Sequence, residues 1–300
     1  MSSDVTLRQL RYFVAAAETG QFSMAASKCY VSQSAITNAI LSLESRLQGN
    51  LFTRKPHGVE LTAEGQRFYR HASHVLNSLQ DALREPRIRA DNLDGSVRIA
   101  ASYTVLGYFL PPLMARFRAH YPDVNLDLHD IPRETIEAKI LSDELDLGIV
   151  ILSNVEDTSR FNCHTLMRTR RQLWAASDHP VLKNQFPALS DIAEHPYILL
   201  TQDDGESSDK RFWLKSNLSP DIAFRTNVME ALRGLVAHGF GITILSDMVY
   251  RPWSLEGKKI EARPILDPIP HMEVGLIWAK NKTFDDATEE MKLFLIQSCD

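Results

Sequence analysis

The chain has 300 residues, more than one ordinary domain, and 44% of them are hydrophobic and 24% charged. This composition allows sizeable buried cores and excludes an intrinsically disordered protein. No run of about 18 apolar residues is present, and the first residues, MSSDVTLRQL, have no apolar signal-peptide core, so we expect a cytoplasmic protein. Cys29, Cys163 and Cys299 lie far apart without CxxC spacing, which argues against a disulfide framework or a zinc site.

The charge is unevenly divided along the chain. The overall net charge of −5 would by itself argue against a nucleic-acid partner. Residues 1–90, however, hold 11 Lys and Arg against 7 Asp and Glu, a net charge of +4, whereas residues 91–300 hold 22 against 31, a net charge of −9. A basic head on an acidic body fits a small DNA-binding module joined to a sensing or catalytic domain.

Three short helical patterns open the chain. Apolar residues recur at helical spacing from Leu7 to Thr19, and Gly20 follows as a stop signal. A second helix is predicted from Phe22 to Tyr30, with Ser23 as its N-cap. A third runs from Ser32 to Leu47 with its apolar residues on one face and polar residues on the other. Two helices joined by such a tight connection are typical of a helix-turn-helix.

A predicted wing and a long helix follow. Residues 51–61 are typical of a short hairpin, with KPHG at residues 55–58 as its turn. A helix is predicted from Thr62 to Arg84, and its apolar residues alternate in steps of four and three, the repeat of a coiled coil. The alternative is that this face packs against the helix's own domain. The residues expected to form a dimer seam are Phe68, Ala72, Val75, Leu79 and Ala82.

The polar segment EPRIRADNLDGS, residues 85–96, is the predicted linker. Beyond it, strand patterns alternate with helical patterns, which favours two lobes of α/β structure with parallel sheets and a cleft between them. The expected strands are 97–102, 124–129, 145–152, 172–176, 197–200, 223–226, 242–245 and 274–278. The expected helices are 105–120, 133–141, 208–217, 228–238 and 284–297.

Four sequence elements in the first 65 residues resemble the LysR-type transcription regulators. They are VSQSAIT at residues 31–37, LE at 43–44, LFTR at 51–54 and LTAEG at 61–65, in the family's order and spacing. The rest of the chain has the family's length and order of elements, so the resemblance covers essentially all 300 residues. The sequence departs from the family pattern at Ser34, where many members have Pro, and at Asn38, where many have Arg.

The resemblance implies an α/β protein overall with three parts. We expect a mainly α winged helix-turn-helix at residues 1–61 and a linker or dimerisation helix with a hinge at 62–90. Residues 91–300 then form a two-lobed effector-binding domain similar to periplasmic solute-binding proteins. Lobe I is expected at about 91–165 and 268–300, and lobe II at about 166–267.

The third helix and the wing carry groups suited to DNA. Glutamine and asparagine amides can pair with adenine at its major-groove edge, and threonine can bond to base edges. Serines near the helix start are expected to bond phosphate, and the basic residues of the wing to reach phosphate or the minor groove. A merely solvated polar face is the alternative. The predicted DNA-binding residues are Ser32, Gln33, Ser34, Thr37, Asn38, Arg54 and Lys55.

Polar residues follow several predicted strands of the second half. Ligands of α/β folds bind at the carboxyl ends of strands, near helix N-termini. Hydroxyls, helix N-termini and one guanidinium suit a small anionic or polar ligand such as a carboxylate. Helix capping is the alternative for the hydroxyls, and pairing with Glu134 or Glu137 is the alternative for the arginine. The predicted effector-binding residues are Ser102, Tyr103, Thr104, Arg133, Thr201, Gln202 and Asn227.

The rival function is an enzyme with a DNA-binding appendage. No GxSxG elbow, HExxH pair or phosphate-binding loop occurs in the sequence. The GFG at residues 239–241 lies between a helix and a strand, the wrong order for dinucleotide binding, and we interpret it as a helix C-cap and turn. His238 is interpreted as a helix-terminal residue. We therefore expect no enzyme activity, no cofactor and no metal. Redox sensing by Cys163 and Cys299, as in some members of the family, is a further alternative, disfavoured because buried cysteines are usually structural.

The sequence thus predicts a sequence-specific transcription regulator that is controlled by a small molecule. Binding between the lobes would shift their closure, and thereby the spacing of the winged heads and the bend of the DNA. The expected partners are double-stranded promoter DNA, the effector, other copies of the chain in a homodimer or homotetramer, and RNA polymerase. The tetramer rests on the family resemblance alone.

Overall fold

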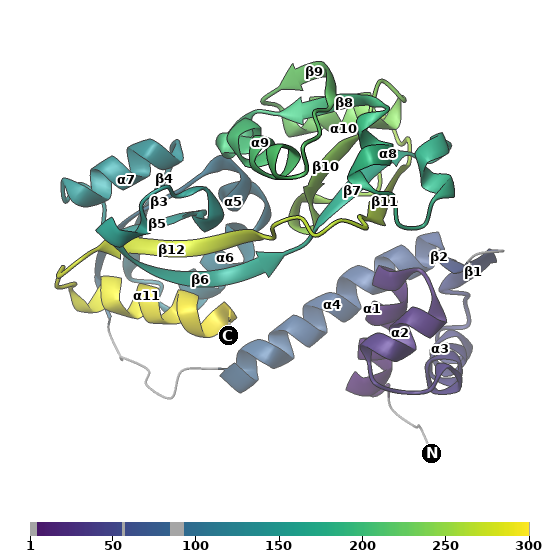
Figure 1. Ribbon diagram of the computed structural model, residues 1–300. Coiled ribbons are helices and arrows are strands. Elements are labelled where there is room, and N and C mark those ends of the chain that lie inside the picture. Colours follow the sequence, from purple (N-terminus) through teal and green to yellow (C-terminus); the bar gives the residue numbers. More distant parts are fainter. Residues whose placement is uncertain (1–4, 56–57, 85–92, 300) are drawn as a thin grey trace. The chain divides into compact units, whose positions relative to one another are not determined.

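The computed structural model describes residues 5–55, 58–84 and 93–299 of the chain. The chain forms two compact units, Met1–Arg87 and Ile88–Asp300 (Figure 1). Each unit is built around a hydrophobic core of its own. No helix within the described ranges is long and apolar enough to cross a membrane.

The first unit is a winged helix-turn-helix. The α1 helix lies at its centre and contacts three other helices. The ring of Phe13 on α1 is fully buried and lies 5.3 Å from the ring of Phe52 and 5.0 Å from that of Phe68. This aromatic cluster joins α1 to the wing and to the long helix. The elements are α1 (Leu7–Thr19), α2 (Phe22–Lys28), α3 (Gln33–Leu47), β1 (Phe52–Lys55), β2 (Gly58–Leu61) and α4 (Ala63–Arg84).

Local hydrogen bonds fix the ends of these helices. The Thr6 side chain accepts a hydrogen bond from the backbone N–H of Gln9, and the Gln9 side chain accepts one from the backbone N–H of Thr6, a capping box. Gly20 ends α1 with a left-handed φ of 67°, which glycine adopts without steric cost. Ser32 caps α3 by accepting from the backbone N–H of Ala35.

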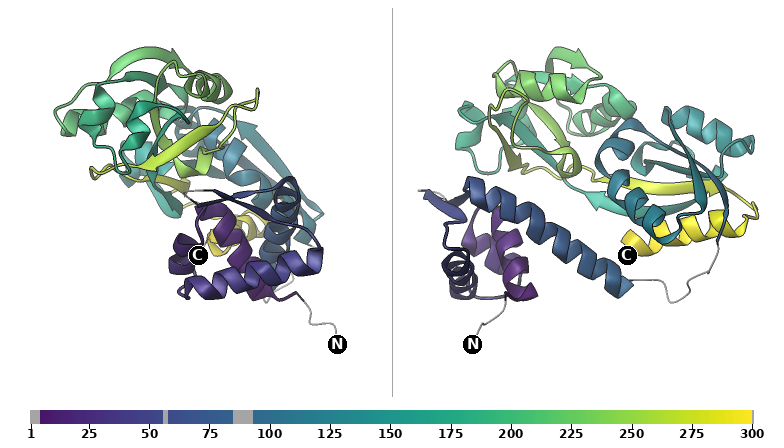
Figure 2. Two further views of the ribbon diagram at one scale, coloured as in Figure 1. Left: turned by 90° about the vertical axis from the view of Figure 1, so that its right-hand side faces the viewer. Right: turned by 180° about the vertical axis from the view of Figure 1, so that it is seen from behind.

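Lobe I of the second unit is a five-stranded sheet in the order β4-β3-β5-β12-β6. Strand β3 pairs in parallel with β4 and β5, whereas β12 is antiparallel to β5 and β6. Figures 1 and 2 show α7 on one face of the sheet and α11 on the other. The lobe contains β3 (Gly95–Ala101), α5 (Tyr103–Tyr108), α6 (Leu110–His120), β4 (Val124–Asp130), α7 (Arg133–Leu141), β5 (Leu147–Ile151), β6 (Phe161–Thr169), β12 (Met272–Ala279) and α11 (Asp286–Cys299).

Lobe II is built on two smaller sheets. Strands β10, β7 and β11 pair antiparallel in that order, and β8 pairs in parallel with β9. A parallel bridge between Tyr197 and Ile242 connects the two sheets. The lobe contains β7 (Arg171–Ala176), α8 (Leu189–Ala193), β8 (Pro196–Leu200), α9 (Gly205–Lys215), β9 (Asp221–Thr226), α10 (Met229–Ala237), β10 (Thr243–Ser246) and β11 (Ile260–Pro264). The chain passes between the lobes twice, from β6 to β7 and from β11 to β12.

The structure corrects the sequence expectations in several places. The single helix expected over 105–120 is two helices, because the prolines in the first turn of α6 lack the N–H that would continue α5. The sheets are not purely parallel, since β12 in lobe I and the β7 sheet in lobe II are antiparallel. Strands β6 and β11 and helix α8 were not expected, because polar residues interrupt the strands and α8 has only five residues.

Candidate DNA-binding surface and inter-lobe cleft

A hollow of about 540 Å³ lies on the first unit, where the starts of α2 and α3 meet the wing. Three of the residues predicted to bind DNA line it: Gln33 and Thr37 from α3, and Arg54 from β1. The fold therefore brings the wing arginine to the same surface as the polar start of α3. The other lining residues are Gln21, Phe22, Ser23, Gly58 and Val59.

Hydroxyl groups at the start of α3 are engaged in local hydrogen bonds. The Oγ of Ser32 accepts from the N–H of Ala35 at 3.3 Å and lies 2.9 Å from the Oγ of Ser34. The Oγ1 of Thr37 donates to the carbonyl oxygen of Gln33 at 3.0 Å. These bonds hold the hydroxyls in place, and the oxygens keep lone pairs that can accept from a ligand.

The amide and guanidinium side chains of three predicted residues are exposed, and the side chain of a fourth lies outside the described part. Gln33 and Asn38 are exposed on α3, and Arg54 is exposed on β1. The backbone of Lys55 belongs to β1, but the placement of its side chain is not described. Exposed amides and a guanidinium are the groups that can bond to bases in the major groove and to the DNA backbone.

Residues at the start of α2 also face the hollow, and sequence reasoning missed them. The N-cap predicted at Ser23 is wrong, because α2 begins at Phe22 and Gln21 occupies the cap position. Ser23 is instead exposed and lines the hollow beside Gln21. The N–H of Val59 donates to the carbonyl of Gly20 at 2.7 Å, which joins the wing to the turn before α2. That tertiary contact leaves no local signal in the sequence.

The apolar face of α4 is divided between two environments. Phe68 packs against the core of the first unit, and Ala72 is 2% exposed there. Val75, by contrast, is 44% exposed, and Leu79 is half-buried. The side chain of Ala82 lies outside the described part of the structure. Packing on its own domain thus accounts for the first half of this face, and dimerisation through the second half stays a prediction.

A narrow cavity of about 40 Å³ lies between the two lobes of the second unit. Its size suits a few water molecules, so the lobes are closed on one another in this conformation. Of the seven residues predicted to bind the effector, Thr104 and Gln202 line the cavity. The remaining lining residues are Ile151, Asn154, Arg171, Leu200, Asp203, Gly205, Ser208, Asp209, Met229, Leu245, Ser246, Val249 and Met272.

An acidic loop of lobe II, residues 202–205 and hereafter the cleft loop, reaches lobe I. The Oδ2 of Asp203 accepts from the N–H of Thr104 at 2.6 Å, and its carbonyl accepts from the Nδ2 of Asn154 at 2.8 Å. The carboxylate of Asp204 accepts from the Nε of Arg133 at 2.6 Å. Both aspartates adopt left-handed backbone angles, φ 51° and 61°, which cost about 1 kcal/mol each. The inter-lobe bonds compensate for that strain.

The other predicted effector residues have different surroundings. Ser102 is 1% exposed, and its Oγ makes no hydrogen bond within the described part of the chain. The guanidinium of Arg133 contacts Glu137 as well as Asp204, so acidic partners already surround it, as in the pairing alternative. Burial opposes its charge, but these hydrogen bonds outweigh that cost and raise the pKa of Arg133. Tyr103, Thr201 and Asn227 are not among the residues that line the cavity.

A buried polar cluster in the cavity wall was missed by the sequence reasoning. The Nη2 of Arg171 donates to the Oγ of Ser208 at 2.6 Å, and the hydroxyl of Tyr197 donates to Asp209 at 2.7 Å. Burial raises the pKa of Asp209 to about 7 and lowers the pKa of Arg171. These residues come from β7, β8 and α9, so only the packed lobe brings them together.

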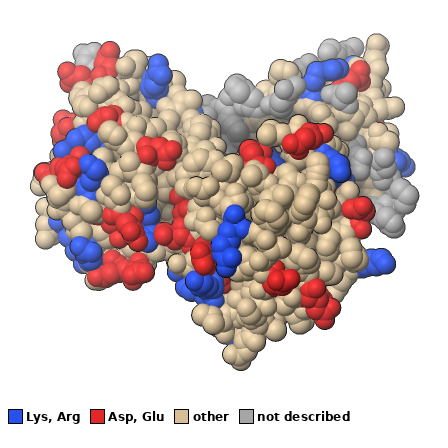
Figure 3. Space-filling model, turned by 90° about the horizontal axis from the view of Figure 1, so that it is seen from above, with Lys and Arg blue, Asp and Glu red and all other residues tan. Residues whose placement is uncertain are grey.

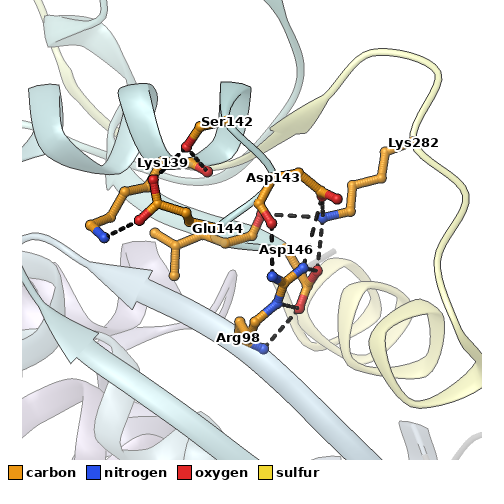
Figure 4. Close-up of polar contacts among 8 residues, drawn as sticks. Arg98, Lys139, Ser142, Asp143, Glu144, Asp146 and Lys282 are labelled. Atoms are coloured by element: carbon orange, nitrogen blue, oxygen red, sulfur yellow. Dashed lines mark hydrogen bonds and ion pairs between the residues drawn. The ribbon is translucent and has the colours of Figure 1, made fainter.

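A salt-bridge network lies in lobe I around Arg98, in the middle of β3 (Figure 4). Nε and Nη2 of Arg98 bond the two carboxylate oxygens of Asp146 at 3.0 and 2.6 Å, and the Nζ of Lys282 lies 2.8 Å from the same carboxylate. Burial opposes the charge of Asp146, but the hydrogen bonds outweigh it and lower its pKa to about 2. This network joins β3 to the segment before β5 and to the loop after β12.

The surface of the protein mixes both signs of charge. Figure 3 shows acidic and basic side chains interspersed over the face that it draws. Several exposed charges of the second unit are paired, for example Lys139 with Glu144 at 2.6 Å and Lys210 with Glu206 at 3.1 Å. Such exposed pairs add little stability.

The three cysteines form no disulfide in the structure. Cys163 and Cys299, the pair considered for a redox switch, pack against different hydrophobic clusters of lobe I. Burial raises the pKa of the Cys163 thiol, which disfavours the thiolate that redox chemistry requires. No group of three His, Cys, Asp or Glu residues able to hold a metal ion occurs among the described residues.

Comparison with known proteins agrees with this architecture. Residues 7–66 match the family pattern "Bacterial regulatory helix-turn-helix protein, lysR family", and residues 90–300 match "LysR substrate binding domain". The DNA-binding transcriptional dual regulator OxyR of Escherichia coli is 27% identical over 292 residues, 96% of this chain and 93% of that protein. The transcriptional regulator CysL of Bacillus subtilis is 26% identical over 243 residues, 81% of each chain.

A solved structure shows the same fold over its full length. HinK, a LysR family transcriptional regulator from Pseudomonas aeruginosa, superposes with a TM-score of 0.62 at 26% identity and covers 98% of this chain and 97% of its own. The two family patterns together span both units, the DNA-binding head and the two-lobed domain. The chain therefore belongs to the LysR family of transcription regulators, proteins with a helix-turn-helix DNA-binding domain and an effector-binding domain rather than enzymes.

Proposed function

We propose that a small effector controls this regulator by changing how the cleft loop joins the two lobes. The observation that carries the proposal is the hydrogen bond from the Thr104 N–H to the carboxylate of Asp203, with the Arg133–Asp204 ion pair beside it. These bonds hold the lobes closed over a cavity too small for most metabolites. A ligand must separate them to enter, so its binding and the closure of the lobes are coupled.

The DNA-binding surface is the second half of the proposal. Gln33 and Thr37 read base edges from α3, Arg54 holds phosphate or enters the minor groove, and Ser32 and Ser34 fix the register on the backbone. We assign Asn38 and Lys55 to the same DNA-binding set on the sequence motif alone. The position of Gln33, Thr37 and Arg54 around one hollow of the first unit supports this division of roles. Gln21 and Ser23 are added to the DNA-binding set because they line the same hollow.

In an oligomer, closure of the lobes would alter how the DNA-binding heads contact the promoter. The half-exposed continuation of the α4 face, Val75 and Leu79, supports pairing of two copies through this helix. We propose a homodimer or homotetramer in which lobe closure alters the spacing of the DNA-binding heads and the bend of the promoter. RNA polymerase is the further partner that this mechanism implies.

The proposal can be tested without knowing the effector. An operator is first selected from random DNA with the wild-type protein, and its footprint and bend are measured. A double variant, Asp203→Ala with Asp204→Ala, removes both carboxylates of the cleft loop, and we expect it to change the length of the footprint or the bend angle. Glu206→Ala is the matched control, because among the described residues this carboxylate pairs with the exposed Lys210 and not with lobe I. An identical footprint and bend in the double variant would exclude lobe closure as the controlling step.

A further inference from the structure

The wall of the inter-lobe cavity holds a guanidinium with unused hydrogen-bonding capacity. The side chain of Arg171 is only 8% exposed. Its Nη2 donates to the Oγ of Ser208 at 2.6 Å and its Nε to the carbonyl of Pro270 at 3.2 Å. Its Nη1 lies 3.6 Å from Asp209, which is an ion pair but too long for a hydrogen bond. The two-pronged bond that arginine makes with a carboxylate is therefore not formed here.

Asp209 balances the positive charge of Arg171 only in part. It is 5% exposed, and one of its oxygens accepts the hydroxyl of Tyr197 at 2.7 Å. Burial raises the pKa of its carboxyl to about 7, so its negative charge is only partly present near neutral pH. Arg171 is consequently a buried cation with an incomplete counter-charge, and a ligand carboxylate in the cavity would supply the missing one.

The same wall also holds an acceptor for a cation. The carboxylate of Asp203 uses Oδ2 to accept from the N–H of Thr104 at 2.6 Å, whereas Oδ1 accepts only a long bond of 3.4 Å, from the Nε2 of Gln202, within the described part of the chain. Oδ1 can therefore accept a hydrogen bond from a ligand ammonium group. A simple anion would instead bring a second negative charge next to Asp203, and like charges in a closed cavity repel strongly. This feature distinguishes the cavity from a site for plain carboxylates.

Apolar side chains complete the cavity. They lie between the charged residues, and once a ligand has separated the lobes they favour a small hydrocarbon group over a polar one. The lining hydrophobic residues are Ile151, Leu200, Met229, Leu245, Val249 and Met272.

We propose that the cleft binds an α-amino acid with a small apolar side chain, with its carboxylate on Arg171 and the Oγ of Ser208 and its ammonium group on Asp203. The inference rests on the proposed function, since it names the chemical class of the effector at the same cleft. It also replaces the simple carboxylate that the sequence suggested with a zwitterion, because the cavity presents both signs of charge.

Calorimetric titration of the full chain with the twenty common L-amino acids tests the assignment. We expect the protein to bind at least one of the amino acids alanine, valine, leucine, isoleucine and methionine. The best ligand is then compared with its deaminated acid and its decarboxylated amine, and each should bind at least about tenfold more weakly, since each loses one charged hydrogen bond. Equal binding of the deaminated acid, or no binding by any amino acid, would overturn the proposal.

Variants of the cavity wall separate the two halves of the site. Asp203→Asn should weaken amino-acid binding at least about tenfold but leave the affinity for the deaminated acid unchanged or higher. Arg171→Met should abolish binding of the amino acid and of its deaminated acid. If this variant does not fold, Arg171→Lys provides a second test, because lysine keeps the positive charge but lacks the paired N–H donors of the guanidinium. Glu206→Gln is the matched control, because it lies outside the cavity wall. Unchanged binding in Asp203→Asn would contradict the ammonium site.

The experiments distinguish an error in the amino-acid assignment from an error in the proposed control through lobe closure. The footprint test of the cleft loop contains no ligand, so it reports on lobe closure whatever the effector is. If that test succeeds and the amino acids do not bind, the cleft controls DNA binding but takes another class of molecule. If an amino acid binds and the footprint of the loop variant is unchanged, the ligand class holds and control through closure is wrong.

Discussion

The backbone N–H of Thr104 in lobe I donates a hydrogen bond of 2.6 Å to the carboxylate of Asp203 in lobe II. The donor stands at the start of α5, where the first backbone N–H groups of a helix have no partner within the helix. A carboxylate from the opposite lobe thus occupies the place where the sequence suggested an anionic effector. The protein therefore closes its cleft with a charged group of its own.

The first prediction concerns the stability of this closure. Asp203→Ala should speed hydrogen exchange at the Thr104 amide by about tenfold or more, because a hydrogen bond to a charged group contributes roughly 1.5–3 kcal/mol. Exchange is measured by NMR or mass spectrometry on the ligand-free protein, with Glu206→Ala as the control. If the Thr104 amide exchanges at the wild-type rate in Asp203→Ala, the bond does not hold the lobes together.

The second prediction concerns base recognition by α3. Gln33→Ala should weaken binding to the selected operator by roughly 1–3 kcal/mol, the contribution of one good base contact, and leave binding to unrelated DNA nearly unchanged. The control is Gln66→Ala, an exposed glutamine of α4 that does not line the hollow. A gel-shift titration measures both affinities. Undiminished discrimination between operator and unrelated DNA would remove Gln33 from the base-reading set.

The third prediction concerns the wing. Arg54→Ala should weaken binding to every DNA sequence and make the slope of log K against log salt less negative by about 0.9, since one phosphate contact is lost. Arg118→Ala removes an equal charge from the exposed surface of α6 and serves as the control. Fluorescence anisotropy at several salt concentrations measures the slope. A slope equal to that of the wild type would place Arg54 away from the phosphates.

The fourth prediction concerns α4 as a dimer helix. Val75→Glu places a charge on the exposed part of its apolar face, and should raise the dimer dissociation constant by tenfold or more through the cost of burying that charge. Sedimentation equilibrium measures the change. Gln66→Glu, which adds the same charge on the exposed start of the helix, is the control. If both variants have the same dimer dissociation constant as the wild type, the dimer forms through another surface.

The sequence predicted most of the elements, because their signals are local. The spacing of apolar residues and the stop at Gly20 act within a few residues and appear as expected, and α3 begins at Gln33, one residue after its predicted start. The proposed DNA-binding surface was partly predictable for the same reason, since its residues belong to a continuous motif and its hairpin. Ser23 was misjudged because capping residues and surface serines look alike in a sequence.

The interior of the cleft could not be predicted in the same way. Arg171, Asp209 and Tyr197 lie on three different elements, and their meeting depends on the packing of lobe II. Nothing in the local pattern shows that Asp203 and Asp204 adopt left-handed angles and turn their carboxylates to the opposite lobe. Polar residues after strands marked the region of the site, but tertiary contacts decided which of them face the cavity.

The last prediction concerns acid stability of the second unit. The pKa of Asp146 is lowered from 3.8 to about 2 in the folded protein. A carboxyl with a lowered folded pKa stabilises the fold fully above its unfolded pKa, and this contribution is lost as the pH falls from about 4 to about 2. Asp146→Asn should therefore reduce the free energy of unfolding by roughly 2 kcal/mol at neutral pH. The deficit should shrink as the pH approaches 2.

Tryptophan fluorescence during urea unfolding measures this effect in the full chain. All four tryptophans lie beyond residue 90, so the signal reports on the second unit alone. Asp143→Asn is the matched control, because this neighbour also pairs with Lys282 but its side chain is 74% exposed; it should cost less and change little with pH. A deficit in Asp146→Asn that is the same at pH 7 and near pH 2 would mean that packing, rather than the ionised carboxylate, makes Asp146 important.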